Sequence, residues 1–228
     1  MDCQHFVVKS RSARFRWGVG LLLLLTFVTA PGCVGAIANL VNVARGNTVP
    51  ANFTGLEGKR IAVVCVSNSE AFGPAGAASS LARTVGKLVK ANVEDVTVID
   101  QQKIEQWIDR NDWDYVDFLA VGRGVNAETV VAIDLDGFSL HDGKTLYKGR
   151  ADISMVVYDM TSGGKEVFAY SPNQIQYPEN MSAHTTDMSE RAFRAQFLNV
   201  LGNRIARQFY PYDVAEDFAR DASVISSS

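Results

Sequence analysis

The chain has 228 residues, of which 22 are Lys or Arg, 25 are Asp or Glu, and 47% are hydrophobic. This length suffices for one domain with a substantial apolar core. The charge balance is slightly acidic, and no cluster of Lys and Arg follows Arg16. Because nucleic-acid binding depends on basic side chains that neutralise phosphates, the composition argues against a nucleic-acid partner.

The first 33 residues have the pattern of an export signal. A basic segment precedes the apolar run Trp17–Ala30, and small residues then lead to Cys33. The run has 14 residues, fewer than the ~20 that a membrane-spanning helix requires. A cysteine at this place resembles the signals of bacterial lipoproteins, so we predict a signal peptide over residues 1–32 and lipid on Cys33. Plain secretion and an uncleaved anchor stay open, because Ala30 and Pro31 are atypical before a lipidated cysteine.

Three further segments follow the signal. Residues 33–57 are interpreted as the lipidated cysteine and a tether, residues 58–213 as one domain, and residues 214–228 as a C-terminal tail. Without the signal the chain carries 18 basic and 24 acidic residues. Cys65 is then the one cysteine left for the domain, and its place in an apolar run predicts a buried, unreactive thiol.

The first half of the domain alternates strands with helices. The β-branched run at 61–66 predicts a buried strand, and a Ser/Gly-rich loop leads to a helix over roughly 77–91. A second strand is expected at 96–99. Asp100 can cap the helix that follows, and a further short helix is expected near 116–121.

The second half reads as a β-meander closed by a helix. Strands are predicted at 129–140, 145–159 and 165–170, joined by glycine-containing turns. A polar loop spans 171–187, and the final helix spans about 188–210, with Asp187 and Glu190 as its capping box. The sequence therefore predicts an α/β fold, in which helices flank a mixed central β-sheet that includes a β-meander.

Four short motifs resemble a group of bacterial envelope lipoprotein domains. They are "GKRIAVVCV" at 58–66, "DFLAVGRGVNAETVVAIDL" at 117–135, "MVVYDMTSGGKEVFAY" at 155–170 and "FLNVLGNRIARQF" at 197–209. The group includes the curli secretion lipoprotein (CsgG), the penicillin-binding-protein activator LpoB and the N-terminal domain of TolB. Each motif is mainly a signal of fold, so the resemblance depends on their order along the chain.

The resemblance implies a membrane-tethered domain that binds envelope proteins and catalyses no reaction, and it leaves homo-oligomers open. Val34 after Cys33 is a pattern that permits passage to the outer membrane, at its periplasmic face. A curli-type pore is not expected, because the strand at 145–159 places Lys148, Arg150 and Asp152 on one face.

Two loops carry the candidate binding residues. The loop at 171–187 is long and mixes apolar with polar side chains, so Tyr170, Ile175, Tyr177 and Met181 are predicted partner contacts. The alternative function is a receptor for a small anionic or glycan ligand, bound through the loop at 67–80. Its candidate residues, at the start of a helix, are Ser67, Asn68, Ser69 and Gly76.

One group of acidic and histidine side chains could hold a metal. It consists of Asp134, Asp136, His141 and Asp142. Because Val131, Ile133 and Leu135 are expected to face the core, the aspartates should face water, and His141 and Asp142 should belong to a hairpin turn. We therefore predict no metal, no cofactor and no catalytic site.

Overall fold

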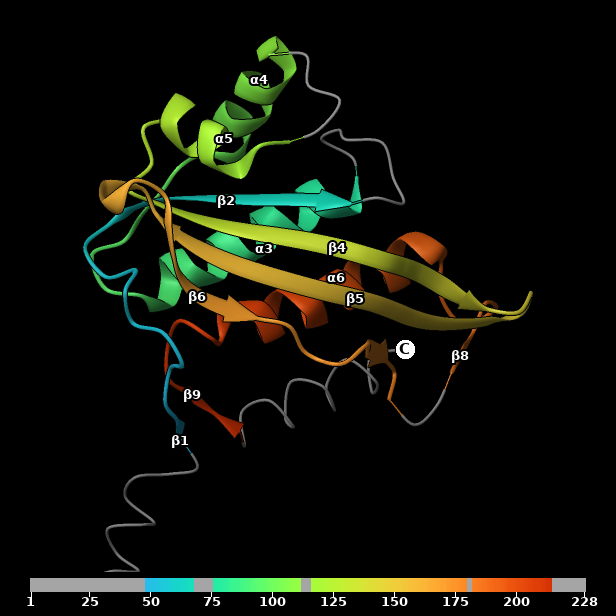
Figure 1. Cartoon of the computed structure of the whole chain (residues 1–228). Coiled ribbons are helices and arrows are strands. Elements are labelled where there is room, and N and C mark those ends of the chain that lie inside the picture. Colours follow the sequence, from blue (N-terminus) through green and yellow to red (C-terminus); the bar gives the residue numbers. More distant parts are fainter. Residues whose placement is uncertain (1–47, 68–75, 112–115, 180–181, 215–228) are drawn as a thin grey trace, which may run out of the picture. The chain divides into compact units, whose positions relative to one another are not determined.

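The computed structural model describes residues 48–67, 76–111, 116–179 and 182–214 (Figure 1). No helix in these residues is long and apolar enough to cross a membrane. The elements, in chain order, are β1 Thr48–Val49, β2 Arg60–Ser67, α3 Ala77–Asn92, β3 Thr97–Val98, α4 Gln101–Asn111, α5 Phe118–Gly124, β4 Thr129–Asp142, β5 Leu146–Asp159, the 3-10 helix η1 Met160–Ser162, β6 Lys165–Tyr170, β7 Ile175–Tyr177, β8 Ala183–His184, α6 Glu190–Ala206 and β9 Tyr212–Asp213.

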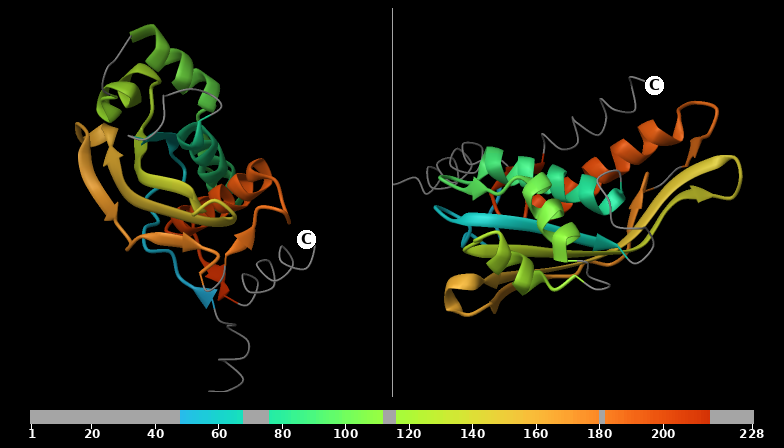
Figure 2. Two further views of the ribbon diagram at one scale, coloured as in Figure 1. Left: turned by 90° about the vertical axis from the view of Figure 1, so that its right-hand side faces the viewer. Right: turned by 90° about the horizontal axis from the view of Figure 1, so that it is seen from above.

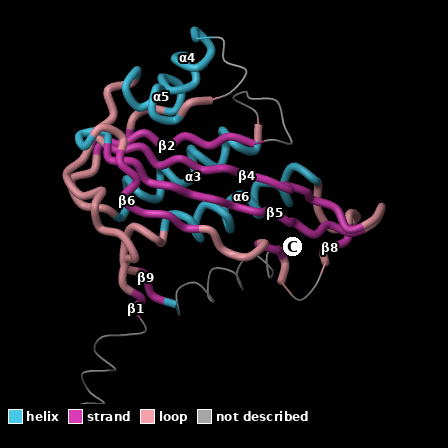
Figure 3. Tube along the Cα trace, in the orientation of Figure 1, coloured by secondary structure: helices cyan, strands magenta, loops and turns pink. Residues whose placement is uncertain are grey.

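A seven-stranded mixed sheet organises the domain (Figure 3). Its main order is β3-β2-β4-β5-β6, and β7 and β8 both pair with β5. Strand β2 runs parallel to β3 and β4, whereas β4, β5 and β6 form antiparallel pairs. The α/β class, the mixed sheet and the meander predicted from the sequence are confirmed.

Helices pack on both faces of the sheet, and each face has its own apolar core (Figure 2). Helices α3 and α6 cover one face, where Phe193, Phe197 and Leu201 of α6 are fully buried. Helices α4 and α5 cover part of the other face through residues such as Ile104 and Val121. Strand β2 lies between the two layers, and this explains why Ile61–Cys65 are buried without alternation.

The residues before β2 take part in the fold. Leu56 is fully buried in the larger core, and Phe53 stacks on Phe168 of β6 at 5.2 Å between ring centroids. Strand β1 pairs with β9 in a small antiparallel sheet. Residues 48–57, assigned to the tether from the sequence, therefore belong to the folded unit.

Two local predictions differ from the structure. Helix α6 is capped by Ser189, whose hydroxyl accepts the backbone N–H of Ala192 at 3.3 Å, so Asp187 is not the cap. The segment predicted as a loop at 171–187 contains β7 and β8, which extend the sheet along β5. Strands of two or three residues leave too little hydrophobic periodicity in the sequence to be recognised.

Candidate functional site

A groove of about 680 Å³ opens where the sheet ends at β3. One wall is α3, with Arg83, Lys87 and Lys90, and the other is α4, with Glu105 and Asp109. Its floor is apolar and comes from Val63, Val98 and Ile99 of the sheet. The volume lies in the range of about 300–1,000 Å³ that is usual for small-molecule and cofactor sites.

A buried carboxylate ties the two walls together. Glu105 of α4 is 7% exposed and accepts two hydrogen bonds from the guanidinium of Arg83 of α3, at 2.8 and 3.0 Å. Its Oε1 also accepts the hydroxyl of Ser79, which is 2% exposed. A buried charge needs partners of this kind, so the bridge holds α3 and α4 at a set separation beside the groove.

The rims of the groove carry charges of opposite sign. Lys87 and Lys90 are exposed on α3, one turn and about two turns beyond Arg83, and share its side of the helix. Asp100 and Asp109 are exposed on the side of α4. Among the described residues, no ion pair involves either lysine. The groove therefore offers a basic rim and an acidic rim on either side of an apolar floor.

The loop predicted to bind a small ligand is described only in part. Ser67 ends β2 and Gly76 precedes α3, and both are partly buried, whereas Asn68 and Ser69 lie outside the described residues. Glu105 places its carboxylate against Ser79 in the first turn of α3. Residues 68–75 of this loop lie outside the described residues, so the ligand site stays a prediction.

Two of the predicted partner-contact residues, Ile175 and Tyr177, turn toward the core. Ile175 is 1% exposed, and the ring of Tyr177 stacks on that of Phe197 with centroids 6.4 Å apart. A buried side chain cannot meet a partner, so Ile175 is corrected from a contact residue to a core residue. Tyr170 is partly buried, and burial raises the pKa of its hydroxyl. Met181, like Cys33, lies outside the described residues.

The four members of the acidic and histidine group are spread along β4. His141 and Asp142 end β4 rather than forming the turn; His141 lies 3.6 Å from Glu190, and Asp142 pairs with Arg150 at 2.9 Å. Asp134 is partly buried, and burial, together with the charge of Asp136, raises its pKa. Within the described ranges, no group of three or more His, Cys, Asp or Glu side chains is arranged to hold a metal ion.

Cys65 is buried in the larger core, as its apolar neighbours in the sequence indicate. Burial raises the pKa of its thiol far above the ordinary value, and the charge of Asp134 adds to the effect. A thiol held in its neutral form is a poor nucleophile. Cys65 is thus a packing residue of β2.

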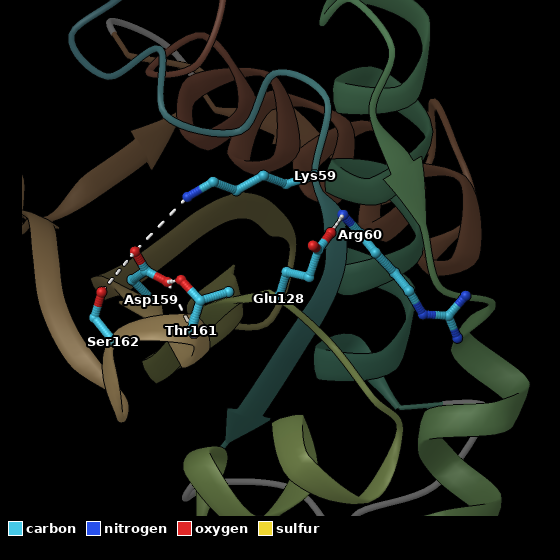
Figure 4. Close-up of polar contacts among 6 residues, drawn as sticks. All are labelled: Lys59, Arg60, Glu128, Asp159, Thr161 and Ser162. Atoms are coloured by element: carbon cyan, nitrogen blue, oxygen red, sulfur yellow. Dashed lines mark hydrogen bonds and ion pairs between the residues drawn. The ribbon is translucent and has the colours of Figure 1, made fainter.

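A second polar cluster lies where β2 and β4 begin and β5 ends (Figure 4). Glu128 accepts the backbone N–H of Arg60 at 2.7 Å, and Lys59 lies 3.8 Å from a carboxylate oxygen of Asp159. Asp159 also accepts the hydroxyl and the backbone N–H of Thr161, and these bonds lower the pKa of its carboxyl. Because the contacts join strand ends to one another, we interpret the cluster as a clamp that keeps the strands in register.

Sequence reasoning did not find the groove. Arg83 and Glu105 are 22 residues apart and sit on different helices, so no local motif marks their contact. One signal was present: Arg83, Lys87 and Lys90 recur at helical spacing and place three cations on one side of a predicted helix.

Comparisons with known proteins concern structure alone, because no protein-family model and no curated protein matches the chain. Three solved structures with low sequence identity are similar. The PelC dodecamer from Paraburkholderia phytofirmans is 10% identical over 72% of this chain and 95% of its own, with a TM-score of 0.42. Lipoprotein GNA1162 from Neisseria meningitidis is 16% identical over 64% and 97%, with a TM-score of 0.40. The LpoB C-terminal domain from Salmonella enterica is 12% identical over 58% and 89%, with a TM-score of 0.35.

Bacterial lipoproteins, LpoB among them, are thus among the solved structures to which this chain is similar. The likeness to CsgG and to TolB stays an expectation from the sequence.

Proposed function

We propose that the chain is a lipid-anchored protein of the bacterial envelope whose domain binds another protein through the groove between α3 and α4. Cys33 carries the lipid, and the domain catalyses no reaction. One observation carries the proposal: the groove has an apolar floor and charged rims, and the bond between Arg83 and Glu105 joins its two walls. An apolar centre within a polar rim is the common anatomy of a protein–protein contact.

The anchor and the groove call for separate tests. Mass analysis of the native amino terminus tests the anchor, and the expected species begins at Cys33 and bears acyl chains. A chain that begins at Met1 without lipid would contradict it.

Crosslinking in intact cells tests the groove. A photoreactive residue placed at Lys87, on the basic rim, is expected to capture an envelope protein that mass spectrometry can identify. The matched control carries the same residue at Asn199, an exposed position of α6. Capture should fail when Lys90→Glu reverses the positive charge that remains on the basic rim. Equal capture from Lys87 and Asn199, or none from Lys87, would refute a groove-bound partner.

A further inference from the structure

The floor of the groove includes an unused sheet edge. Strand β3 bonds to β2 on one side, through the N–H of Thr97 to the oxygen of Lys59 at 2.9 Å and the N–H of Ile99 to the oxygen of Ile61 at 2.8 Å. Backbone groups alternate in direction along a strand, so the N–H and C=O of Val98 point away from β2. No strand in the described part of the chain pairs with that outer side, and Val98 lines the groove.

This edge is short, as protected edges often are, but no strand in the described part of the chain covers it. Native proteins blunt edges by shortening the strand or covering it. Strand β3 has two residues, yet α3 and α4 flank it on opposite faces of the sheet and leave about 680 Å³ between them. Gln101 and Gln102 also line the groove, and Thr97 and Asp100 are both exposed. An extended segment can therefore lie along the edge with a helix on either side.

The rim charges specify the sequence of such a segment. Side chains of an added strand alternate between the two faces of the sheet. Those on one face meet Lys87 and Lys90 of α3, and those on the other meet Asp109 of α4. Charge complementarity therefore favours acidic residues on the first face and basic residues on the second.

We propose that the groove binds an extended segment of a partner protein, with alternating acidic and basic side chains, that adds as a strand to the outer edge of β3. This rests on the proposed function, because it specifies how the partner is recognised. A second copy of this chain fits less well. Antiparallel pairing of two β3 edges about a two-fold axis would place α3 beside α3, and Lys87 and Lys90 would face their own copies.

Binding of synthetic peptides to the full chain in detergent micelles tests the proposal. The probe is a fluorescent octapeptide of alternating Glu and Lys, and the control peptide has four Glu followed by four Lys. Both have the same composition, but only the first places like charges on one face of a strand. The alternating peptide is expected to bind about tenfold more tightly, since several rim-exposed ion pairs contribute together. Affinity should fall as salt screens the rims.

Two modified probes separate strand addition from attraction by charge alone. In one the backbone nitrogens of all Glu residues are methylated, and in the other those of all Lys residues. Only one set of N–H groups faces β3, so one peptide should lose binding and the other should retain it. Amide hydrogen exchange at Val98 should slow with the unmodified probe. Unchanged binding of both methylated peptides, or equal affinity for the alternating and block peptides, would overturn the proposal.

Variants of the protein complete the test. The double variant Lys87→Glu, Lys90→Glu should weaken the alternating peptide about tenfold, whereas Lys144→Glu, an exposed lysine in the β4–β5 turn, should not. A dimer that the double variant dissociates would show that a second copy occupies the edge, and would overturn the proposal. Peptide binding without cellular capture would refute the proposed function alone. Cellular capture without selective peptide binding would refute strand addition alone.

Discussion

The ion pair between α3 and α4 gives a quantitative prediction. Glu105 is 7% exposed and accepts bonds at 2.8 and 3.0 Å from Arg83, whose side chain is 38% exposed. Hydrogen bonds to charged groups contribute about 1.5–3 kcal/mol, and the exposure of the arginine reduces that gain. We expect Arg83→Met to lower the free energy of unfolding by about 2 kcal/mol, because it leaves a buried carboxylate unpaired.

Replacing Glu105 instead of Arg83 should lower the free energy of unfolding by less. Glu105→Met leaves a guanidinium that can turn to water, and the double variant leaves no buried charge at all. Urea unfolding followed by circular dichroism would give the four free energies of a double-mutant cycle, with an expected coupling of about 1–2 kcal/mol. The same cycle on Arg204 and Glu179, whose side chains are 44% and 69% exposed, should give less than about 0.5 kcal/mol. Equal coupling energies for the two pairs would show that the buried pair of Arg83 and Glu105 stabilises the fold no more than an exposed ion pair does.

Three other substitutions test the packing and the charge of the domain. Ile175→Ala should lower the free energy of unfolding by about 2–4 kcal/mol, because it opens a cavity in the core. Gln176→Ala, at an exposed position, should change that free energy by no more than about 0.5 kcal/mol. Similar losses for the two variants would contradict the burial of Ile175. Burial raises the pKa of Asp134, so the native state holds the carboxyl proton more tightly than the unfolded chain does. The protonated carboxyl therefore contributes its full stability below the pKa of the unfolded state. That stability is lost as the pH rises through the higher pKa of the folded state. Thermal unfolding should therefore show that Asp134→Asn stabilises near pH 7 and has little effect near about pH 3, and a gain confined to acid would reverse the assignment. Gly202→Ala should lower the free energy of unfolding by about 1–3 kcal/mol, although alanine has the better helix propensity, because the new Cβ would lie 2.6 Å from Cγ2 of Thr84. Thr84→Ser removes that methyl group and should restore most of the lost stability. A more stable Gly202→Ala variant would disprove this close approach.

Segments with strong local patterns were predictable to within a few residues. The strand at 165–170 is β6 as predicted, and the helix expected at 77–91 is α3, Ala77–Asn92. The strand expected at 145–159 begins one residue later, at Leu146. These segments carry their apolar residues at the period of their structure, so the pattern suffices without knowledge of the fold.

Features that depend on tertiary contacts were not predictable from such patterns. Ile175 and Tyr177 sit among polar residues in the sequence, and only their pairing with β5 directs them to the core. The groove depends on the packing of α3, β3 and α4, which no local spacing encodes. The cations of its basic rim recur in the sequence at helical spacing, but Asp109 of the acidic rim comes from another helix.

The small sheet formed by β1 and β9 fixes the place at which residues 48–49 join the folded domain. Phe53, just after β1, stacks on Phe168 of β6, at the border of the main sheet opposite β3. A force applied at Thr48 would therefore reach the main sheet near its edge strand β6, whereas the groove opens at β3, at the other end of the sheet order. Under the proposed function, a partner would meet the domain at the edge of β3, away from the edge strand on which Phe53 packs.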